Sequence, residues 1–336
     1  MTSAQRTPRR FSHLFDASEH LILYLCLAYY VLMIFLAPGF FTVHNHWSLL
    51  FNLLPLLIVS VGQTLVMLTA GIDLSVTSVV ALSSVVGGYV MSSDHGTLSP
   101  FWAITLGVGA MLLAGLLVGL ANGLAVVRLG MPPFMVTLTT MIFFSGLAIW
   151  FTTSQNIYNL PEAFVDLPYA RWLGLPAPLY IGGAVVGLAY YVLNRTPLGQ
   201  WLYAVGLNPK AARISGVDVS ATLLFAYAMS GVCAAIASVL YTARLETGSP
   251  VMGQHILLDV IGAVVIGGTS LFGGKGKVRW TVYGVLFIVL LDNSLNLIGL
   301  SYFLIMIVKG SVILLAAVAY VWQERSGALV SEQAVE

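Results

Sequence analysis

Charged side chains inside apolar stretches are the residues of this sequence most able to do chemistry. Asp292 shares a helical stripe with Asn296, and Lys309 follows a tight turn at Leu300. At ~1.5 Å rise per residue, Asp292 and Lys309 both lie about 12 Å from that turn, at one depth on neighbouring antiparallel helices. An isolated charge at that depth would cost several kcal/mol. We predict a structural ion pair between them, because a proton relay would normally offer more carboxylates without a fixed partner.

A second carboxylate motif, GIDLS at 71–75, stands between two apolar segments. Gly71 breaks a helix, and Asp73 can cap the next helix through the free amides of its first turn. A carboxylate at a broken helix can also bind a substrate or an ion, as it does in transporters. Both interpretations stay open, and the structural motif formed by Gly71, Asp73 and Ser75 is favoured.

Patterns typical of enzymes are absent from the sequence. The segment 267–276, GGTSLFGGKG, superficially looks like a phosphate-binding loop, but Gly276 replaces the required Ser or Thr and Thr269 replaces a Gly. The histidines lie in loops or at segment ends, and His44-x-His46 alone is a weak metal pattern. We therefore predict no catalytic residue, no metal and no cofactor, and no ATP binding by this chain.

The polar segment 195–219 separates two strongly apolar segments. Within it, Asn208 is a plausible N-cap, Pro209 fits the first helical position, and Gly216 can end the helix. A helix of about seven residues is too short to be stable alone in water, so something must pack against it. On the inner face of a membrane protein, such a helix would let a soluble motor push on a channel-forming subunit.

Composition places the chain among membrane proteins. It is 59% apolar and 8% charged, with a mean hydropathy of +0.93. The net charge of +1 gives no basic field for nucleic acid. Cys26 and Cys233 lie in apolar runs and are expected to be core residues without a disulfide.

About ten membrane spans are predicted from apolar runs of about 20 residues. They fall near 20–38, 48–70, 73–92, 100–127, 134–153, 177–194, 220–243, 257–273, 280–299 and 301–322. The chain then has one membrane domain, 20–322, between tails 1–19 and 323–336. Placing both termini in the cytoplasm satisfies the positive-inside rule, because it puts these cations inside: Arg6, Arg9, Arg10, Arg128, Arg195, Lys210, Arg213, Lys275, Lys277, Arg279 and Arg325.

A path for a small polar solute needs apolar walls, aromatic faces and a few amides or hydroxyls. Residues of these types in the spans are Asn52, Gln63, Asn122, Thr137, Thr139, Phe143, Phe144 and Asn296, and the first candidates among them are Asn52, Gln63, Phe143 and Asn296. Glycines at GxxxG spacing predict close helix packing rather than chemistry. They are Gly115, Gly119 and Gly123, and Gly183 with Gly187.

Four long stretches resemble the permease subunits of ribose-type ABC importers, within the branched-chain amino acid permease superfamily. They are GQTLVMLTAGIDLSVTSVVALSS at 62–84, MPPFMVTLTTMIFFSGLA at 131–148, LGQWLYAVGLNPKAARISGVDV at 198–219 and LLDVIGAVVIGGTSLFGGKGKV at 257–278. They follow the order of the family and cover nearly the whole chain. Met131, Thr139-Thr140 and Asp292 depart from the usual pattern, and the last is compensated in our interpretation by Lys309.

The resemblance implies an all-α, type II importer-like fold, with two permease copies around a central path in the bacterial inner membrane. It implies docking of a separate ATPase on the 209–215 helix and its surroundings, and docking of a periplasmic or lipoprotein solute-binding protein outside. The coupling residues would be Ala204, Gly206, Asn208, Pro209, Ala211, Ala212, Ser215 and Gly216. A monosaccharide is the expected solute. An ion-coupled secondary transporter, or an ABC permease for a nucleoside, amino acid or autoinducer, remains the alternative.

Overall fold

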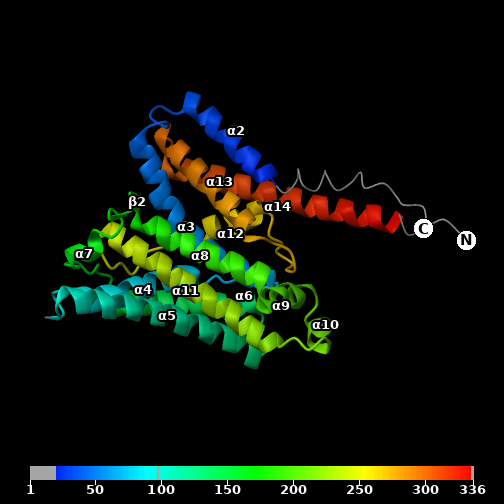
Figure 1. Cartoon of the computed structure of the whole chain (residues 1–336), viewed down its shortest axis with the longest axis horizontal. Helices are drawn as coiled ribbons and strands as arrows, with labels where there is room; N and C mark the ends of the chain where they lie inside the picture. The colour runs from blue at the N-terminus through cyan, green and yellow to red at the C-terminus, as the bar shows by residue number, and fades with distance from the viewer. Residues whose placement is uncertain (1–19, 97, 334–336) are drawn as a thin grey trace, which may run out of the picture.

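The computed structural model describes residues 20–96 and 98–333, with side chains up to residue 318. The predicted tail 1–19, with Arg6, Arg9 and Arg10, lies outside the described residues, as does the side chain of Arg325. The helices are α2 Leu21–Leu36, α3 Val43–Leu68, α4 Val76–Met91, α5 Pro100–Arg128, α6 Pro133–Thr152, α7 Glu162–Val165, α8 Ala177–Arg195, α9 Pro197–Leu207, α10 Pro209–Ile214, α11 Val219–Leu245, α12 Leu257–Gly267, α13 Val278–Leu297 and α14 Tyr302–Gln333 (Figure 1).

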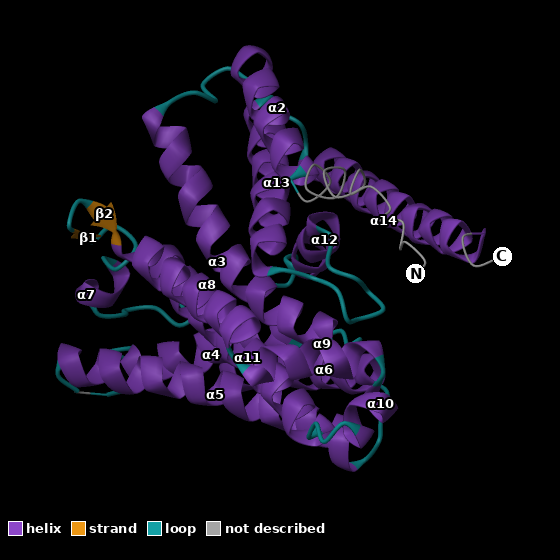
Figure 2. Ribbon diagram, turned by 45° about the vertical axis from the view of Figure 1, so that its right-hand side comes forward, coloured by secondary structure: helices purple, strands orange, loops and turns teal. Residues whose placement is uncertain are grey.

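The described residues form an almost entirely helical fold. Six helices (α3, α5, α6, α8, α11 and α13) are long and apolar enough to cross a membrane, and α2, α4, α12 and the first part of α14 are shorter apolar helices. Each of the ten predicted segments therefore contains one helix. Arg171–Trp172 (β1) and Leu175–Pro176 (β2) pair as a small antiparallel hairpin before α8 (Figure 2).

Helix α11 forms the centre of the fold, because it packs against α3, α4 and α5. The first two glycines of the α5 motif allow the closest approach. A Cβ at Gly115 would overlap the carbonyl oxygen of Gly231, and one at Gly119 would overlap that of Tyr227. Small residues at helix contacts let backbones come together in this way.

The second glycine motif does not behave as predicted. A Cβ at Gly183 or Gly187 in α8 would meet nothing within 4 Å among the described residues. The packing interpretation is therefore wrong for these two glycines within one copy of the chain, because spacing alone does not say which helix face meets a neighbour.

Several predicted boundaries also differ. Helix α3 begins at Val43, since Thr42 caps it by accepting a hydrogen bond from Asn45 N at 3.2 Å. The span expected over 257–273 ends as a helix at Gly267, where Gly268 adopts a φ of +107°. An irregular loop then runs to α13. Helix α14 continues beyond 322, into the predicted tail.

The polar segment 195–219 is more ordered than the sequence predicts. It holds α9 as well as the predicted short helix, and Thr196 caps α9 by accepting from Gly199 N at 3.4 Å. Pro197 fits the first turn of this helix. Thr196 and Pro197 are ordinary helix-start residues, but a helix was predicted only at 209–215, within a loop that includes 197–207.

Candidate functional site

The short helix α10 is built by its predicted end signals. The Asn208 carbonyl oxygen Oδ1 accepts hydrogen bonds from Lys210 N and Ala211 N, both at 3.0 Å. Pro209 opens the helix, and Gly216 adopts a φ of +85° after its end. These contacts satisfy amides and shape the exit of a helix of six residues, which is otherwise too short to persist.

The predicted coupling residues separate into two groups. Asn208, Pro209, Ala211, Ser215 and Gly216 are exposed, whereas Gly206 and Ala212 are buried and Ala204 is half-buried. The buried part rests on a small apolar cluster of Val205, Ala212 and Val219. The segment thus has an inner face that fixes it to the fold and an outer face open to a partner.

Exposed apolar side chains on this outer face were not anticipated. Leu207, the last residue of α9, is 74% exposed, and Ile214, the last residue of α10, is 88% exposed. Lys210 and Arg213 are exposed between them. Exposed apolar side chains on both sides of two cations are typical of a surface that binds another protein.

Gly206 joins α9 to the C-terminal end of α3. A Cβ at this position would overlap the carbonyl oxygen of Leu68 and would lie 2.5 Å from Gly274 N. Those two groups are themselves joined, since Gly274 N donates to Leu68 O at 2.9 Å. Only glycine lets three backbone segments meet at this point.

The glycine-rich loop after α12 is the third member of this junction. The Tyr203 hydroxyl of α9 donates to Gly276 O at 2.8 Å, and burial raises the pKa of Tyr203, which keeps it a donor. A Cβ at Gly273 would lie 2.7 Å from Ala70 N. The loop that resembles a phosphate site is therefore a packing element between α9 and the end of α3.

Loss of the Asn208 cap should loosen α10 alone. Asn208→Leu removes both hydrogen bonds to the Asn208 side chain, and loss of such a cap destabilises a helix by about 1 kcal/mol. Amide exchange at residues 210 and 211 should therefore become about fivefold faster. Hydrogen exchange with mass spectrometry measures this change. Asn208→Ser is the matched control, because serine is also a good cap. Unchanged exchange in the leucine variant would show that tertiary packing, not the cap, holds α10.

Asp73 lies at the centre of a buried polar cluster next to that junction. Its Oδ1 accepts from Ser75 N at 2.9 Å and from Ser75 Oγ at 2.6 Å, and its Oδ2 accepts from Ser230 Oγ of α11 at 2.8 Å. Asp73 is 1% exposed, so protein donors occupy both carboxylate oxygens. Asp73 stabilises the turn before α4 without being the N-cap residue itself, which is Ser75.

Other helices hold the same turn through polar side chains. Asn122 Nδ2 of α5 donates to Ser75 Oγ at 2.8 Å, and Thr137 Oγ1 of α6 donates to Ile72 O at 3.0 Å. When the Gln63 side-chain amide of α3 is oriented so that its nitrogen and its oxygen each have a partner, it donates to Asp73 O at 3.0 Å and accepts from Asp73 N at 3.3 Å. This arrangement supports the structural interpretation of the motif.

Removing the Asp73 carboxylate should destabilise the whole fold. Asp73→Ala leaves the buried Ser75 and Ser230 hydroxyls without their acceptor, at a cost of about 1–3 kcal/mol for each unsatisfied group. Thermal unfolding of the purified chain in detergent should show a clear drop in the melting temperature. Asp94→Ala is the control, since the Asp94 carboxylate contacts Asn159 at an exposed site. A stable variant that lacks only its function would instead make Asp73 a ligand.

Lys309 contacts two carboxylates rather than one. Its Nζ lies 3.1 Å from Asp292 Oδ1, as predicted, and also 2.9 Å from Asp259 Oδ2 of α12. The Lys309 and Asp259 side chains are mostly buried, while that of Asp292 is 42% exposed. Sequence analysis missed Asp259, although a carboxylate inside the predicted span 257–273 was a signal that another charge lay nearby.

The four first candidates for the path, Asn52, Gln63, Phe143 and Asn296, lie on three helices, α3, α6 and α13. Gln63 is fully buried in the Asp73 cluster and lines no open surface in the described structure. The other three are exposed, on three different helices. Asn52 accepts from Arg244 Nη1 at 2.6 Å, Phe143 packs edge-on against Phe144, and Asn296 Nδ2 donates to Asp292 O at 2.7 Å.

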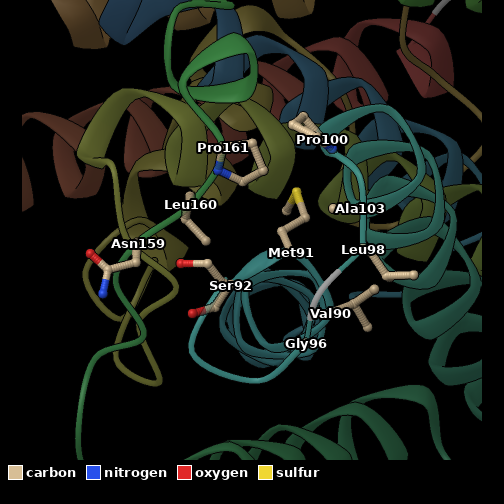
Figure 3. A pocket seen from close by; sticks show the side chains of 11 residues that line it. Val90, Met91, Ser92, Gly96, Leu98, Pro100, Ala103, Asn159, Leu160 and Pro161 are labelled. Atoms are coloured by element: carbon tan, nitrogen blue, oxygen red, sulfur yellow. The ribbon is translucent and has the colours of Figure 1, made fainter.

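A small hollow lies where α4 ends and α5 begins. It has a volume of about 170 Å³, and Met91, Ser92, Ala103, Asn159 and Pro161 contribute to its lining (Figure 3). Ligand sites usually measure about 300 Å³ or more. None of the predicted path residues lines this hollow. A path lined by them would therefore have to form between exposed surfaces of this chain and another subunit.

Possible metal sites are also limited. Among the described residues, no group of three or more His, Cys, Asp or Glu side chains could hold a metal ion. His46 lies against protein partners instead, with Nε2 2.6 Å from the Tyr30 hydroxyl and Nδ1 2.7 Å from Thr42 O.

Comparison with known proteins identifies the family. The sequence pattern of the family described as "branched-chain amino acid transport system / permease component" matches residues 46–317. The ribose import permease protein of Escherichia coli K12 is 38% identical over 84% of this chain and 87% of its own length. That of Haemophilus influenzae is 37% identical over 84% and 86%.

Relatives named for other sugars match as well. The D-allose transport system permease protein of Escherichia coli is 34% identical over 84% of this chain and 85% of its own length. The L-arabinose transport system permease protein of the same organism is 32% identical over 95% and 94%. With a helical membrane fold and matches of this length, the chain belongs to the family of branched-chain amino acid transport system permease components.

Proposed function

We propose that this chain is the membrane-spanning subunit of an ATP-driven, binding-protein-dependent importer, and that its solute is a monosaccharide. The names of its relatives support this solute class, since they import ribose or transport D-allose or L-arabinose. The chain performs no covalent chemistry in this proposal, and ATP hydrolysis belongs to a partner subunit.

The observation that carries the mechanism is the junction at Gly206. The exposed face of α9–α10, with Asn208, Pro209, Ala211, Ser215 and Gly216, receives the ATPase. Movement of this face is passed to α3, because Gly206 packs directly on the Leu68 carbonyl. Ala204 and Ala212 hold the segment to the fold from its inner side.

Transport follows from two states of the permease that differ in access. A loaded periplasmic or lipoprotein binding protein docks on the outer loops, and ATP binding closes two ATPases inside. The ATPases bind the two permease states with different affinities, and this difference shifts the equilibrium between inward and outward access.

The membrane setting and the assembly complete the proposal. The chain lies in the bacterial inner membrane with both termini in the cytoplasm, an orientation favoured by its cation distribution. Two permease copies, identical or related, enclose the path. The exposed residues Asn52, Phe143 and Asn296 are candidates for its lining, since each presents a polar or aromatic group on a helix long and apolar enough to cross a membrane.

Affinity purification of the tagged chain from native membranes, followed by mass spectrometry, tests the assembly first. An ATPase and a solute-binding protein are expected to copurify. The complex is then reconstituted in vesicles and supplied with ribose, D-allose or L-arabinose. Uptake that requires ATP and survives an ionophore supports the importer. Uptake without ATP that collapses with the ion gradient would instead establish a secondary transporter.

A further inference from the structure

The loop after α12 ends in an ordered turn with an aromatic tip. Ser270 N donates to Lys275 O at 2.8 Å, and Phe272 N donates to Ser270 Oγ at 3.1 Å. These bonds close the turn, and they hold Phe272 where its side chain is 65% exposed. We name residues 270–275 the Phe272 turn. A rigid, exposed aromatic residue is a typical anchor of a protein interface.

The Phe272 turn lies against the α9–α10 segment. A Cβ on Gly274 would lie 2.5 Å from Leu207 Cδ2, so the Leu207 side chain packs on the backbone of the turn. Leu207 directly precedes Asn208, the cap of α10. In both whole-chain views the loop between α12 and α13 descends beside α9 (Figures 1 and 2).

The exposed groups of the two elements are of the same kind. Phe272 adds a third apolar side chain to Leu207 and Ile214, and Lys275 is exposed like Lys210 and Arg213. A partner that covers this surface must offer apolar pockets with acidic groups beside them. Lipid headgroups also attract cations, but a lipid would not explain why the turn packs on Leu207, directly before the cap of the coupling helix.

We propose that the Phe272 turn is a second docking element for the ATPase, continuous with α10. Phe272 inserts into an apolar pocket of the ATPase, and acidic side chains of the ATPase face Lys275. This inference rests on the proposed function, because it takes the ATPase as the partner of α10.

A second contact at this place has a mechanical consequence. Gly274 N is bonded to Leu68 O, and Gly273 packs on Ala70, which has a φ of +60°. A force on the turn therefore reaches the end of α3 directly, without passing through α9. The Asp73 cluster begins three residues further along the chain and joins α4, α5, α6 and α11.

Photocrosslinking in the complete importer tests the contact. A benzophenone amino acid is placed at 272, at 214 as a reference on α10, and at 134 as a control. Phe134 is 54% exposed and lies at the start of α6, on the same predicted side of the membrane. Crosslinks to the ATPase are expected from 272 and 214 and not from 134.

The other crosslinking outcomes are distinguishable. A crosslink from 214 without one from 272, or a lipid adduct alone at 272, overturns the second docking element and leaves the coupling helix in place. A lack of ATPase crosslinks from both positions overturns the proposed function itself.

Substitution gives an independent measurement in the same complex. Phe272→Ser should weaken ATPase association about tenfold, as expected for removal of an interface anchor, whereas Phe134→Ser should change it less than twofold. ATPase dissociation from the detergent-solubilised complex is measured for both variants. Equal dissociation of the two variants would contradict the proposal, provided that both chains remain monodisperse.

Discussion

Gly206→Ala is expected to lower ATP-driven uptake about tenfold or more while the chain still inserts into the membrane. The added Cβ would overlap the Leu68 carbonyl oxygen and would lie 2.5 Å from Gly274 N, so it enters the hydrogen bond between these groups. Backbone atoms cannot rotate away as a flexible side chain does. Overpacking of this kind costs about 1–3 kcal/mol. A free-energy change of about 1.4 kcal/mol already shifts an equilibrium constant tenfold.

The matched control is Gly109→Ala, in α5. A Cβ at Gly109 would meet nothing within 4 Å among the described residues, so the same chemical change is made in a helix without a collision. Uptake and the amount of chain in the membrane are measured for both variants in the reconstituted importer. Normal uptake by the Gly206 variant would show that the α3–α9 junction does not transmit motion. Gly206→Pro, which also breaks α9, should abolish uptake.

Local rules predicted the parts of this structure that depend on neighbouring residues in the sequence. The N-cap at Asn208, the proline at 209 and the glycine at 216 fixed α10 because each acts on backbone groups within one turn. The contact between Lys309 and Asp292 was predicted from their equal distance to the turn between their helices, since the rise per residue of a helix is constant.

Contacts between distant segments were beyond those rules. Gly206 contacts the end of α3, well over a hundred residues away in the sequence. The residues around Gly206 contain no pattern that predicts this contact. Gln63 was predicted to line a path because it is polar, but in the structure its amide pairs with the buried backbone N–H and C=O of Asp73, in the turn between α3 and α4. The glycine-rich loop had the composition of a ligand loop, while its role in the structure is close packing.

Lys309→Met is expected to destabilise the fold strongly, in a way that a second substitution repairs. The Lys309 ammonium lies 2.9 Å from Asp259 Oδ2 and 3.1 Å from Asp292 Oδ1. Without it, the mostly buried Asp259 carboxylate has no cation to compensate it, and the charge of Asp292 lies close by. Removal of one partner from a buried ion pair costs about 3–5 kcal/mol. The yield of folded chain and its melting temperature in detergent should both fall.

The repair distinguishes the two carboxylates. Asp259 is mostly buried and Asp292 is 42% exposed, so an uncompensated charge costs more at Asp259. In the Lys309→Met background, Asp259→Asn should restore most of the melting temperature, and Asp292→Asn should restore less. Equal rescue would mean that water or a second copy of the chain leaves both carboxylates equally solvated. A Lys309→Met chain as stable as the original would show that the three side chains are not coupled, and Asp292 would then be free to act on the solute.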